Sequence, residues 1–349
     1  MSDIDIRTEG HAGRITLTRP KALNALTHQM CLDIEAALDG WRDDPAVSLV
    51  IIDAAGDKAF CAGGDIQKLY DTGRAGDLSY GRTFWRDEYR LNAKIAEYPK
   101  PYVAFLNGFT MGGGVGIGCH GSHRIVDDTS RIAMPECSIG LVPDVGGSLL
   151  LARAPGRLGE YLGITGARMG PADAIHAGFA DSYIPGDRWP DLIATLCDTG
   201  DISALAPACE TPPQGALSPA RTAIDAAFAG ETLHDILRAL RPDDSPLAQD
   251  ALRKIAHNSP LSMACTVEMI HRLRGPAADI RRALDLEYRF TYRAMEDGDF
   301  LEGIRARIID KDNAPDWRHD LETLPAVAIS RMLMPLGADT LTLTDHKEG

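Results

Sequence analysis

Hydrophobic and polar positions alternate between strand-like and helix-like spacing through roughly the first 200 residues. Short apolar runs bounded by proline, glycine or acidic residues predict strands within residues 13–20, 48–56, 102–108, 123–128 and 130–136. Longer segments with apolar residues three and four positions apart predict helices within residues 25–41, 79–98, 146–154, 157–165 and 171–178. Thr27 has the residue type and place of an N-cap for the first of these helices. The alternation of strand and helix predicts an α/β fold.

A different pattern begins near residue 200. The segment LAPACETPPQGALSPA, residues 205–220, holds four prolines in sixteen positions, a composition that disfavours regular structure. Beyond it nearly every segment has helical periodicity, as in residues 243–258 and 277–297. We therefore predict an α/β core over residues 1–200, a linker over 201–220 and a helical C-terminal region over 221–349. The chain shows no internal repeat of fixed period.

Composition narrows the class of protein. The chain has 349 residues, of which 44% are hydrophobic and 25% charged, so it can bury a large core. A formal net charge of −14 disfavours a nucleic-acid surface, which needs clustered Lys and Arg. Seven cysteines lack C-x-x-C spacing, which indicates reduced thiols, and no apolar run is long enough to span a membrane. The first thirteen residues also lack the apolar core of a secretory signal. We expect a soluble cytoplasmic protein.

Two glycine-rich segments each follow a predicted strand. They are FCAGGDI, residues 60–66, and GFTMGGGVGIGCH, residues 108–120. Glycine lets another group lie directly against the main chain, and a helix that starts at such a turn presents unpaired N–H groups that stabilise negative charge. Packing is the alternative explanation for an isolated Gly-Gly pair. Because two such turns occur, we interpret them as donors for a developing oxyanion.

Several other chemistries lack their motifs. The sequence has no G-x-S-x-G, no G-x-x-x-x-G-K-[ST], no H-E-x-x-H and no Cys and His cluster at zinc spacing, so no metal site is predicted. Gly116 to Gly121 does satisfy G-x-G-x-x-G, with Glu136 twenty residues after Gly116. A dinucleotide site requires the first of these glycines to follow a strand directly, and the predicted strand ends about eight residues earlier. A dinucleotide-binding fold is therefore disfavoured.

Carboxylates provide the remaining chemistry. The segment MPECSIGLVPDVGG, residues 134–147, places Glu136 and Asp144 in apolar, proline-stiffened chain. Burial there would raise their pKa values and suit them to general acid or base catalysis. The alternative for Asp144 is a helix N-cap, and Glu88, on the predicted helix of residues 79–98, has the ordinary alternative of a charge that faces water.

Together these segments resemble the crotonase (enoyl-CoA hydratase/isomerase) superfamily. The likeness rests on AFCAGGDI (residues 59–66), NGFTMGGGVGIG (residues 107–118) and MPECSIGLVPDVGG, and it extends over nearly the whole chain, to about Trp317. Within the superfamily it is greatest to the 3-hydroxyisobutyryl-CoA hydrolases, on the P-E-x-x-I-G-L-x-P-D-V-G-G run and the C-terminal segment of residues 286–317. The resemblance implies a crotonase-type spiral of ββα units with a helical C-terminal region.

The resemblance also implies roles for particular residues. Gly64 and Gly113 match the two positions whose N–H groups form the oxyanion hole for a thioester carbonyl. Glu136 matches the principal catalytic glutamate, Asp144 an acidic position of the hydrolase branch, and Glu88 a substrate-contacting glutamate. At position 116 this chain departs from the enoyl-CoA hydratases: they carry a second catalytic glutamate there, whereas the chain has Gly116, which leaves room for substrate.

These matches lead to an expected activity, the hydrolysis of a short branched β-hydroxyacyl-CoA, foremost 3-hydroxyisobutyryl-CoA in valine catabolism. An enoyl-CoA hydratase or isomerase of the same superfamily is the alternative, and a non-enzymatic acyl-CoA sensor is disfavoured because Glu136 and both glycine turns are present. The acyl-CoA is the expected partner, and CoA is part of the substrate, so no cofactor is expected. The sequence leaves open the acyl group, whether Glu136 is nucleophile or general base, and the size of any homo-oligomer.

Overall fold

The computed structural model describes residues 3–343, so the first two residues and the last six of the predicted helical region lie outside the description. The chain forms two compact units, each built from segments that are separate in the sequence. Unit 1 comprises the chain up to Gly64, Arg90–Ala133 and Arg168–Ala216. Unit 2 comprises Asp65–Tyr89, Met134–Ala167 and the chain from Leu217 onward.

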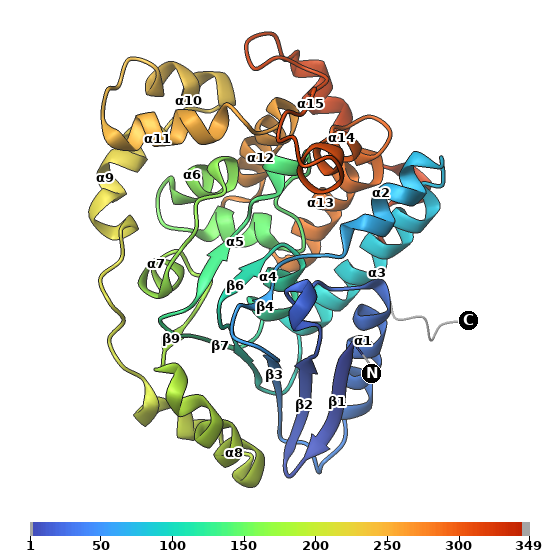
Figure 1. Cartoon of the computed structure of the whole chain (residues 1–349), viewed down its shortest axis with the longest axis vertical. Coiled ribbons are helices and arrows are strands. Elements are labelled where there is room, and N and C mark those ends of the chain that lie inside the picture. Colours follow the sequence, from blue (N-terminus) through green and yellow to red (C-terminus); the bar gives the residue numbers. More distant parts are fainter. Residues whose placement is uncertain (1–2, 344–349) are drawn as a thin grey trace. The chain divides into compact units, whose positions relative to one another are not determined.

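Unit 1 contains two β-sheets. Six strands lie in the order β1-β2-β3-β5-β7-β9 and three in the order β4-β6-β8; β1 and β2 are antiparallel and the other neighbours are parallel (Figure 1). The strands are β1 (Ile4–Glu9), β2 (Ala12–Leu17), β3 (Leu49–Ala54), β4 (Ala59–Cys61), β5 (Tyr102–Phe105), β6 (Phe109–Met111), β7 (His123–Val126), β8 (Arg131–Ala133) and β9 (Ser182–Tyr183). The central strands are continuous apolar runs, as expected for parallel strands that are buried on both faces.

From β3 onward, successive strands alternate between the two sheets. β3, β5 and β7 lie in the six-stranded sheet, and β4, β6 and β8 lie in the three-stranded sheet. In chain order each pair is followed by a helix: α2 (Ile66–Arg74), α4 (Gly113–Gly118) and the 3₁₀ helix η2 (Glu136–Ile139). Because the pairing is parallel within both sheets, the chain advances by one strand in each sheet per repeat. This is the spiral of ββα units that the resemblance to the crotonase superfamily implies.

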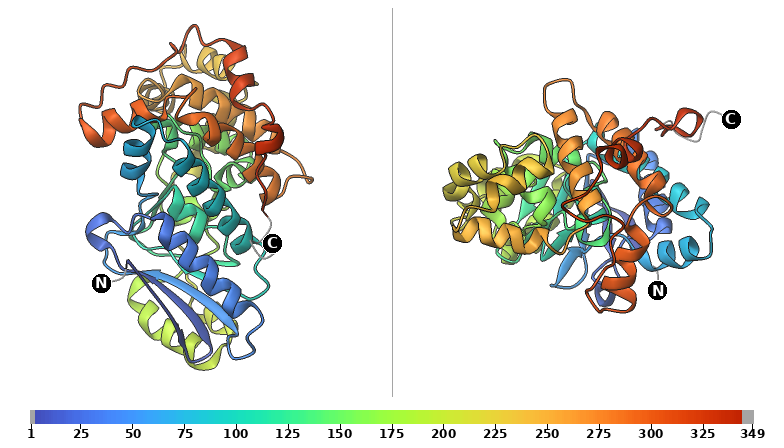
Figure 2. Two further views of the ribbon diagram at one scale, coloured as in Figure 1. Left: turned by 90° about the vertical axis from the view of Figure 1, so that its right-hand side faces the viewer. Right: turned by 90° about the horizontal axis from the view of Figure 1, so that it is seen from above.

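Neighbouring residues of β2 show how helices cover both faces of the six-stranded sheet. Ala12 belongs to an apolar cluster with α8 (Trp189–Thr199), whereas a Cβ added at Gly13 would lie 2.4 Å from the ring of Trp41 on α1 (His28–Arg42). Successive side chains of a strand point to opposite faces, so α1 and α8 cover opposite sides. Figure 2 (left) shows β1 and β2, in dark blue, between these helices.

α1 begins as predicted, because the hydroxyl of Thr27 accepts a hydrogen bond from the N–H of Met30 at 3.2 Å.

The remaining helices of unit 1 are short. They are η1 (Pro20–Ala22), α7 (Pro171–His176), η3 (Gly186–Arg188) and η4 (Ile202–Ala208). The boundary between the units falls within α3 (Ser79–Ala96).

Unit 2 is helical. Besides α2, the first part of α3 and η2, it contains α5 (Gly147–Arg153), α6 (Leu158–Thr165), α9 (Leu217–Ala227), α10 (Leu233–Leu240), α11 (Pro246–Ile255), α12 (Pro260–Leu273), α13 (Ile280–Ala294), α14 (Phe300–Ile304), the π-helix η5 (Arg305–Ile309), α15 (Ala326–Met332) and η6 (Gly337–Asp339) (Figure 1). α5 and α6 pack closely, since a Cβ at Gly159 would lie 2.1 Å from the carbonyl oxygen of Leu151. Side-chain N-caps begin four of the later helices: Thr232, Ser245, Ser259 and Asp279.

The predicted strands and helices of the first 200 residues are confirmed. The strands β1, β4, β6 and β9 and the helices α2 and α8 were not predicted. β6 has only three residues, too few for a period-2 pattern to stand out. Nothing tests the division into residues 1–200, 201–220 and 221–349, which stays a prediction. Within the described residues, none of the helices is long and apolar enough to cross a bilayer.

Candidate active site

The first glycine turn follows β4. Residues 62–64 continue from Cys61, and Gly63 adopts φ of +121°, which side chains rarely allow. Gly64 forms a parallel bridge with Leu26, whose N–H donates to the carbonyl of Gly63 at 2.9 Å. Parallel pairing of this kind uses the groups that flank Gly64. The N–H of Gly64 itself therefore points away from Leu26.

The second glycine turn joins β6 to α4. Gly112 is the N-cap of α4, with φ 49° and ψ −122°, and Gly113 is its first residue. The first N–H groups of a helix have no acceptor within it, so the N–H of Gly113 is oriented outward at the positive end of the helix. Gly116 lies inside α4, as does Gly118, so the G-x-G-x-x-G pattern is helical here and does not form the strand-to-helix turn of a dinucleotide site.

The two turns lie side by side because β4 and β6 are parallel neighbours, which brings their carboxyl ends to one edge of the sheet. A Cβ at Gly114 would lie 2.2 Å from the carbonyl oxygen of Cys61, and a Cβ at Gly63 would lie 3.6 Å from that of Met111. Glycine at 114 is thus a packing requirement, while Gly64 and Gly113 carry the N–H groups. The packing explanation therefore holds at Gly114, whereas the role of Gly64 and Gly113 as oxyanion donors stays a prediction.

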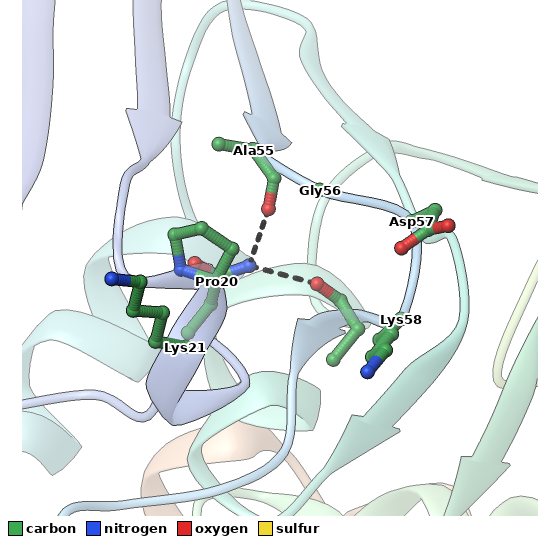
Figure 3. Close-up of a pocket in the computed structure, with 8 residues that line it drawn as sticks. Pro20, Lys21, Ala55, Gly56, Asp57 and Lys58 are labelled. Carbon is green, nitrogen blue, oxygen red and sulfur yellow. Dashed lines mark hydrogen bonds between the residues drawn. The ribbon is translucent and has the colours of Figure 1, made fainter.

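A pocket lies at the start of β4 (Figure 3). It has a volume of about 220 Å³ and is lined by Pro20, Lys21, Asn24, Ala55, Gly56, Asp57, Lys58 and Ala59. The side-chain amide of Asn24 donates to the carbonyls of Ala55 at 3.0 Å and Ala59 at 2.8 Å, which ties the η1 turn to the β3–β4 loop. Asn24 has φ of 54°, in the left-handed region that Asn tolerates better than most residues. β4 runs from this pocket to the first glycine turn.

Unit 2 holds a cluster of buried carboxyl groups. Glu88 is 3% exposed on α3, Glu136 4% exposed at the start of η2, Asp144 4% exposed in the loop before α5, and Glu287 fully buried on α13. Buried acids are uncommon unless they are paired or functional. The Oε2 atom of Glu136 has no hydrogen-bond partner. Because Glu88 is buried, the alternative that it is a solvent-facing charge on an amphipathic helix is wrong.

Asp144 is held through its side chain. The hydroxyl of Tyr89, the residue after Glu88 on α3, donates to Asp144 Oδ2 at 2.8 Å, and the same hydroxyl lies 3.5 Å from Oγ1 of Thr291 on α13. The N-cap of α5 is Gly146, with no side-chain capping bond. The structure thus gives Asp144 a buried tyrosine as partner in place of the helix end.

The turn after Asp144 is bound to α13. Glu287 accepts hydrogen bonds from the N–H of Gly146 at 2.8 Å and the N–H of Ser148 at 3.1 Å, and also from the hydroxyl of Ser148. Val145, between Asp144 and Gly146, has φ of 53°. A β-branched residue in this region is strained, at a cost of about 1–3 kcal/mol that the surroundings must offset.

Burial is the first cause of every pKa shift in this cluster. It raises the pKa of Asp144 to about 7 against the hydrogen bond from Tyr89, and that of Glu287 to about 8 against the hydrogen bonds from Ser148 and Gly146. The pKa of Glu136 is raised well above its usual value by burial and then by the charge of Asp144. The same two causes raise the pKa of Glu88. The pKa values of Asp144 and Glu287 allow these two carboxyls to exchange protons near neutral pH.

The sequence of the chain matches a known enzyme family. The sequence profile described as enoyl-CoA hydratase/isomerase matches residues 12–333. The chain belongs to the enoyl-CoA hydratase/isomerase family. The predicted crotonase resemblance is therefore confirmed, and the chain is an enzyme of this family.

Two curated relatives bear the name 3-hydroxyisobutyryl-CoA hydrolase, mitochondrial. The one from Gallus gallus is 36% identical over 98% of this chain and 91% of its own length, and the one from Danio rerio is 39% identical over 91% and 85%. Because these proteins are mitochondrial, the prediction of a cytoplasmic location is wrong. The features behind it, reduced cysteines and the lack of apolar runs, do not distinguish one aqueous, reducing compartment from another.

Two solved structures share the fold closely. A protein described as an enoyl-CoA hydratase from Rhodobacter sphaeroides 2.4.1 is 58% identical with a TM-score of 0.94, covering 98% of this chain and 100% of its own. A carnitinyl-CoA dehydratase from Mycobacterium thermoresistibile is 41% identical with a TM-score of 0.93, covering 98% and 99%. The predicted crotonase-type α/β fold is confirmed.

The six site residues that the resemblance predicts fall into two groups. Gly64, Gly113 and Gly116 lie in unit 1, and Glu88, Glu136 and Asp144 lie in unit 2. Each group is assembled within its own unit from segments distant in sequence. Within residues 3–343, no set of three or more His, Cys, Asp or Glu side chains is arranged to hold a metal ion. The roles of the six residues stay predictions.

Sequence reasoning missed Tyr89 and Glu287. A signal for Glu287 was available, because it shares one helical face with the buried Ile280, Ala283, Leu284 and Thr291. An acid on the apolar face of a helix needs a buried partner, and here that partner is the α5 turn. Tyr89 had no comparable signal, since a buried tyrosine is ordinary in a helix that packs against others.

Proposed function

We propose that this enzyme hydrolyses the thioester of a short branched β-hydroxyacyl-CoA, foremost 3-hydroxyisobutyryl-CoA, to the free acid and CoA, a step of valine catabolism. The names of the Gallus gallus and Danio rerio relatives support this substrate. The observation that carries the choice of hydrolysis over hydration is Gly116. It places no side chain on α4 where the resemblance assigns hydratases a second glutamate, while Asp144 supplies a buried carboxyl elsewhere.

The N–H groups of Gly64 and Gly113 stabilise the oxyanion that forms when the thioester carbonyl is attacked. Backbone donors suit this role because the fold holds them in place before the reaction begins. Removal of one such donor typically costs about 3–4 kcal/mol of barrier. The close packing at Gly114 keeps the two turns in register.

Glu136 has two chemical routes. As a nucleophile its carboxylate adds to the thioester carbonyl, expels the CoA thiolate and leaves an anhydride that water cleaves. As a general base it takes a proton from a water molecule that attacks directly. Its unpartnered Oε2 atom is available for either role. Label in the Glu136 side chain after a single turnover in ¹⁸O-labelled water would establish the anhydride route, because water that attacks the thioester directly leaves the Glu136 oxygens unchanged.

Asp144 binds the β-hydroxyl of the acyl group or relays the proton to the leaving group, and Glu88 hydrogen-bonds the polar end of the substrate. The hydrogen bond from Tyr89 orients the Asp144 carboxyl for this task. A raised pKa lets Asp144 be donor or acceptor near neutral pH.

The pocket at the start of β4 suits the other end of the substrate. Lys21 and Lys58 line it, and CoA carries phosphates that lysine side chains can neutralise. A strand of three residues, β4, separates this pocket from the turn that bears Gly64. We therefore propose that Lys21 and Lys58 bind phosphate groups of CoA.

A thiol-release assay with purified protein tests the proposal. We expect free CoA from 3-hydroxyisobutyryl-CoA at rates well above those from straight-chain acyl-CoAs. Glu136→Gln should lower kcat by about 1,000-fold or more with binding nearly unchanged, since the residue acts in the transition state. No thiol release from any short acyl-CoA, or a Glu136→Gln variant within about tenfold of the wild type, would contradict it.

Enoyl-CoA hydration is the second candidate, favoured by the description of the Rhodobacter sphaeroides protein. Hydration consumes an enoyl-CoA without releasing thiol, so parallel assays of crotonyl-CoA and 3-hydroxyisobutyryl-CoA separate the two. A wild-type enzyme that hydrates crotonyl-CoA and releases no thiol would establish this candidate.

A further inference from the structure

The turn after Asp144 has a conformation that its own sequence disfavours. Val145 is 1% exposed with φ of 53°, and Gly146 follows with φ of 80°. Glycine adopts this region freely, but a β-branched residue does not. Such a conformation persists only where the surroundings impose it, and it is often found beside reacting groups.

Glu287 imposes it from a distant part of the chain. Its Oε2 atom accepts from the N–H of Gly146 at 2.8 Å, and its Oε1 atom accepts from the N–H and the hydroxyl of Ser148. Both oxygens are therefore engaged on the two sides of Gly147. Since Glu287 is fully buried on α13, water offers the turn no substitute partner.

The same helix also reaches the Asp144 side chain. Thr291, one turn after Glu287, lies 3.5 Å from the Tyr89 hydroxyl that donates to Asp144. The carbonyl of Asp144 accepts from the N–H of Gly147 at 2.7 Å. α13 thus borders Asp144 on its backbone side through Glu287 and on its carboxyl side through Tyr89.

We infer that Glu287 is a positioning residue that holds the Asp144 carboxyl in its working place by keeping Val145 in the left-handed conformation. The inference rests on the proposed function, in the form in which Asp144 recognises the β-hydroxyl of the acyl group. Glu287 itself does not contact substrate: both of its oxygens are occupied by the α5 turn.

A purely structural role makes a different prediction. Glu287 also serves as a remote N-terminal cap for α5, whose N-cap residue, Gly146, provides no side-chain bond. If that were its whole role, its loss would lower the melting temperature and leave substrate selectivity unchanged. The ratio of kcat/KM for 3-hydroxyisobutyryl-CoA to that for isobutyryl-CoA, which lacks the hydroxyl, distinguishes the two roles.

Glu287→Gln is the first variant. At a pH above 8, where the wild-type Glu287 is ionised, the amide keeps the shape but sets an N–H₂ donor against one of the N–H groups of the turn, so a hydrogen bond is replaced by repulsion. We expect the selectivity ratio to fall by about tenfold, in parallel with Asp144→Asn. The matched control is Asp285→Asn on the same helix, which loses only an ion pair with Arg289 and should keep the ratio.

Val145→Gly supplies the second test. Glycine takes the left-handed conformation without strain, so it should restore at least part of the selectivity when added to Glu287→Gln, although the loss of a buried side chain lowers the melting temperature. If Glu287→Gln does not fold, Ser148→Ala replaces it, because it removes one of the three bonds to Glu287. The expected result is then a smaller fall in the ratio, again reversed by Val145→Gly.

The outcomes separate this inference from the proposed function. If the wild type releases no thiol, the proposed function fails before Glu287 is tested. If the wild type is active and selective but the folded Glu287→Gln or Ser148→Ala variant keeps the full ratio, the positioning role is overturned. A lowered ratio that Val145→Gly does not raise would overturn the part assigned to Val145.

Discussion

At the scale of single residues, the feature that sets this protein apart is a set of carboxyl groups removed from water. Glu88, Glu136, Asp144 and Glu287 all have raised pKa values, with burial as the leading cause. Mutual repulsion adds to burial, because the charge of Asp144 raises the pKa of each of the other three. A change at one of these residues should therefore be visible in the titration of another.

Asp144→Asn tests this interaction through the pH profile. If Glu136 must be ionised to react, the acid limb of kcat/KM reports its raised pKa and should lie well above the usual range of a carboxyl. Asparagine removes a negative charge, so the pKa of Glu136 should fall and the acid limb should move to lower pH. The maximum should drop by about 100-fold.

Steady-state kinetics across the pH range, with Glu268→Gln as an exposed carboxyl control, provide the measurement. An acid limb that stays in place or moves to higher pH in Asp144→Asn would show that the two carboxyls do not interact in this way.

At the scale of elements, the important arrangement is a strand, a glycine turn and a helix that lie beside a second strand and its glycine turn. Parallel pairing of β4 with β6 brings the two turns to one sheet edge. The approach is so close at Gly114 that no side chain fits. Glycine at position 114 thus permits the close approach of the two turns, and the orientation of the N–H groups depends on that approach.

Gly114→Ala should disrupt this arrangement. Its Cβ would lie 2.2 Å from the backbone oxygen of Cys61, so one turn must move. We expect about 1–3 kcal/mol of destabilisation from overpacking. A displaced Gly113 N–H should also lower kcat by about 100-fold.

The matched control is Gly40→Ala in α1, where an added Cβ meets nothing within 4 Å. Alanine there should stabilise the protein by about 1 kcal/mol, because glycine is a poor helix former. Thermal unfolding and thiol release measure both variants. Equal behaviour of the two would refute the close-packing explanation.

At the scale of the whole molecule, chain order and compact units do not coincide. Unit 2 is made of three separated segments, and its carboxyl cluster draws on all three: α3, the chain around η2 and α5, and α13. The stability of the protein should therefore depend on the protonation of a cluster that no single segment contains.

Stability should fall as pH rises through neutrality. The folded pKa values of Asp144, about 7, and Glu287, about 8, exceed the ordinary values of 3.8 and 4.5 for these side chains. Between about pH 4 and pH 8 the folded state thus binds more protons than the unfolded state, and the free energy of unfolding declines with pH. Each such group contributes a slope of at most about 1.4 kcal/mol per pH unit.

Denaturant unfolding at pH 5, 6, 7 and 8, in steps of about one unit within the linkage window, measures this decline. Glu287→Gln should flatten the curve relative to the wild type, and Asp285→Asn should leave it unchanged. A wild-type stability that rises across this range would contradict the raised pKa values.

The sequence by itself determined what depends on neighbours along the chain. Apolar runs and helical spacing predicted most strands and helices, and the Thr27 cap is where the pattern placed it. The glycine turns and the pair of Glu136 and Asp144 were also legible, because a local composition of glycine, or of acid among apolar residues and prolines, restricts what a segment can do.

Only the tertiary structure decided which residues meet Asp144. Tyr89 lies 55 residues before it, and Glu287 bonds to Gly146 across 141 residues. Periodicity cannot choose such partners, because many helices offer an equally suitable buried face. Burial of Glu88 and the left-handed conformation of Val145 are likewise consequences of packing. Local pattern specifies each element and its apolar side, whereas desolvation and strain arise only when distant elements close around the same group.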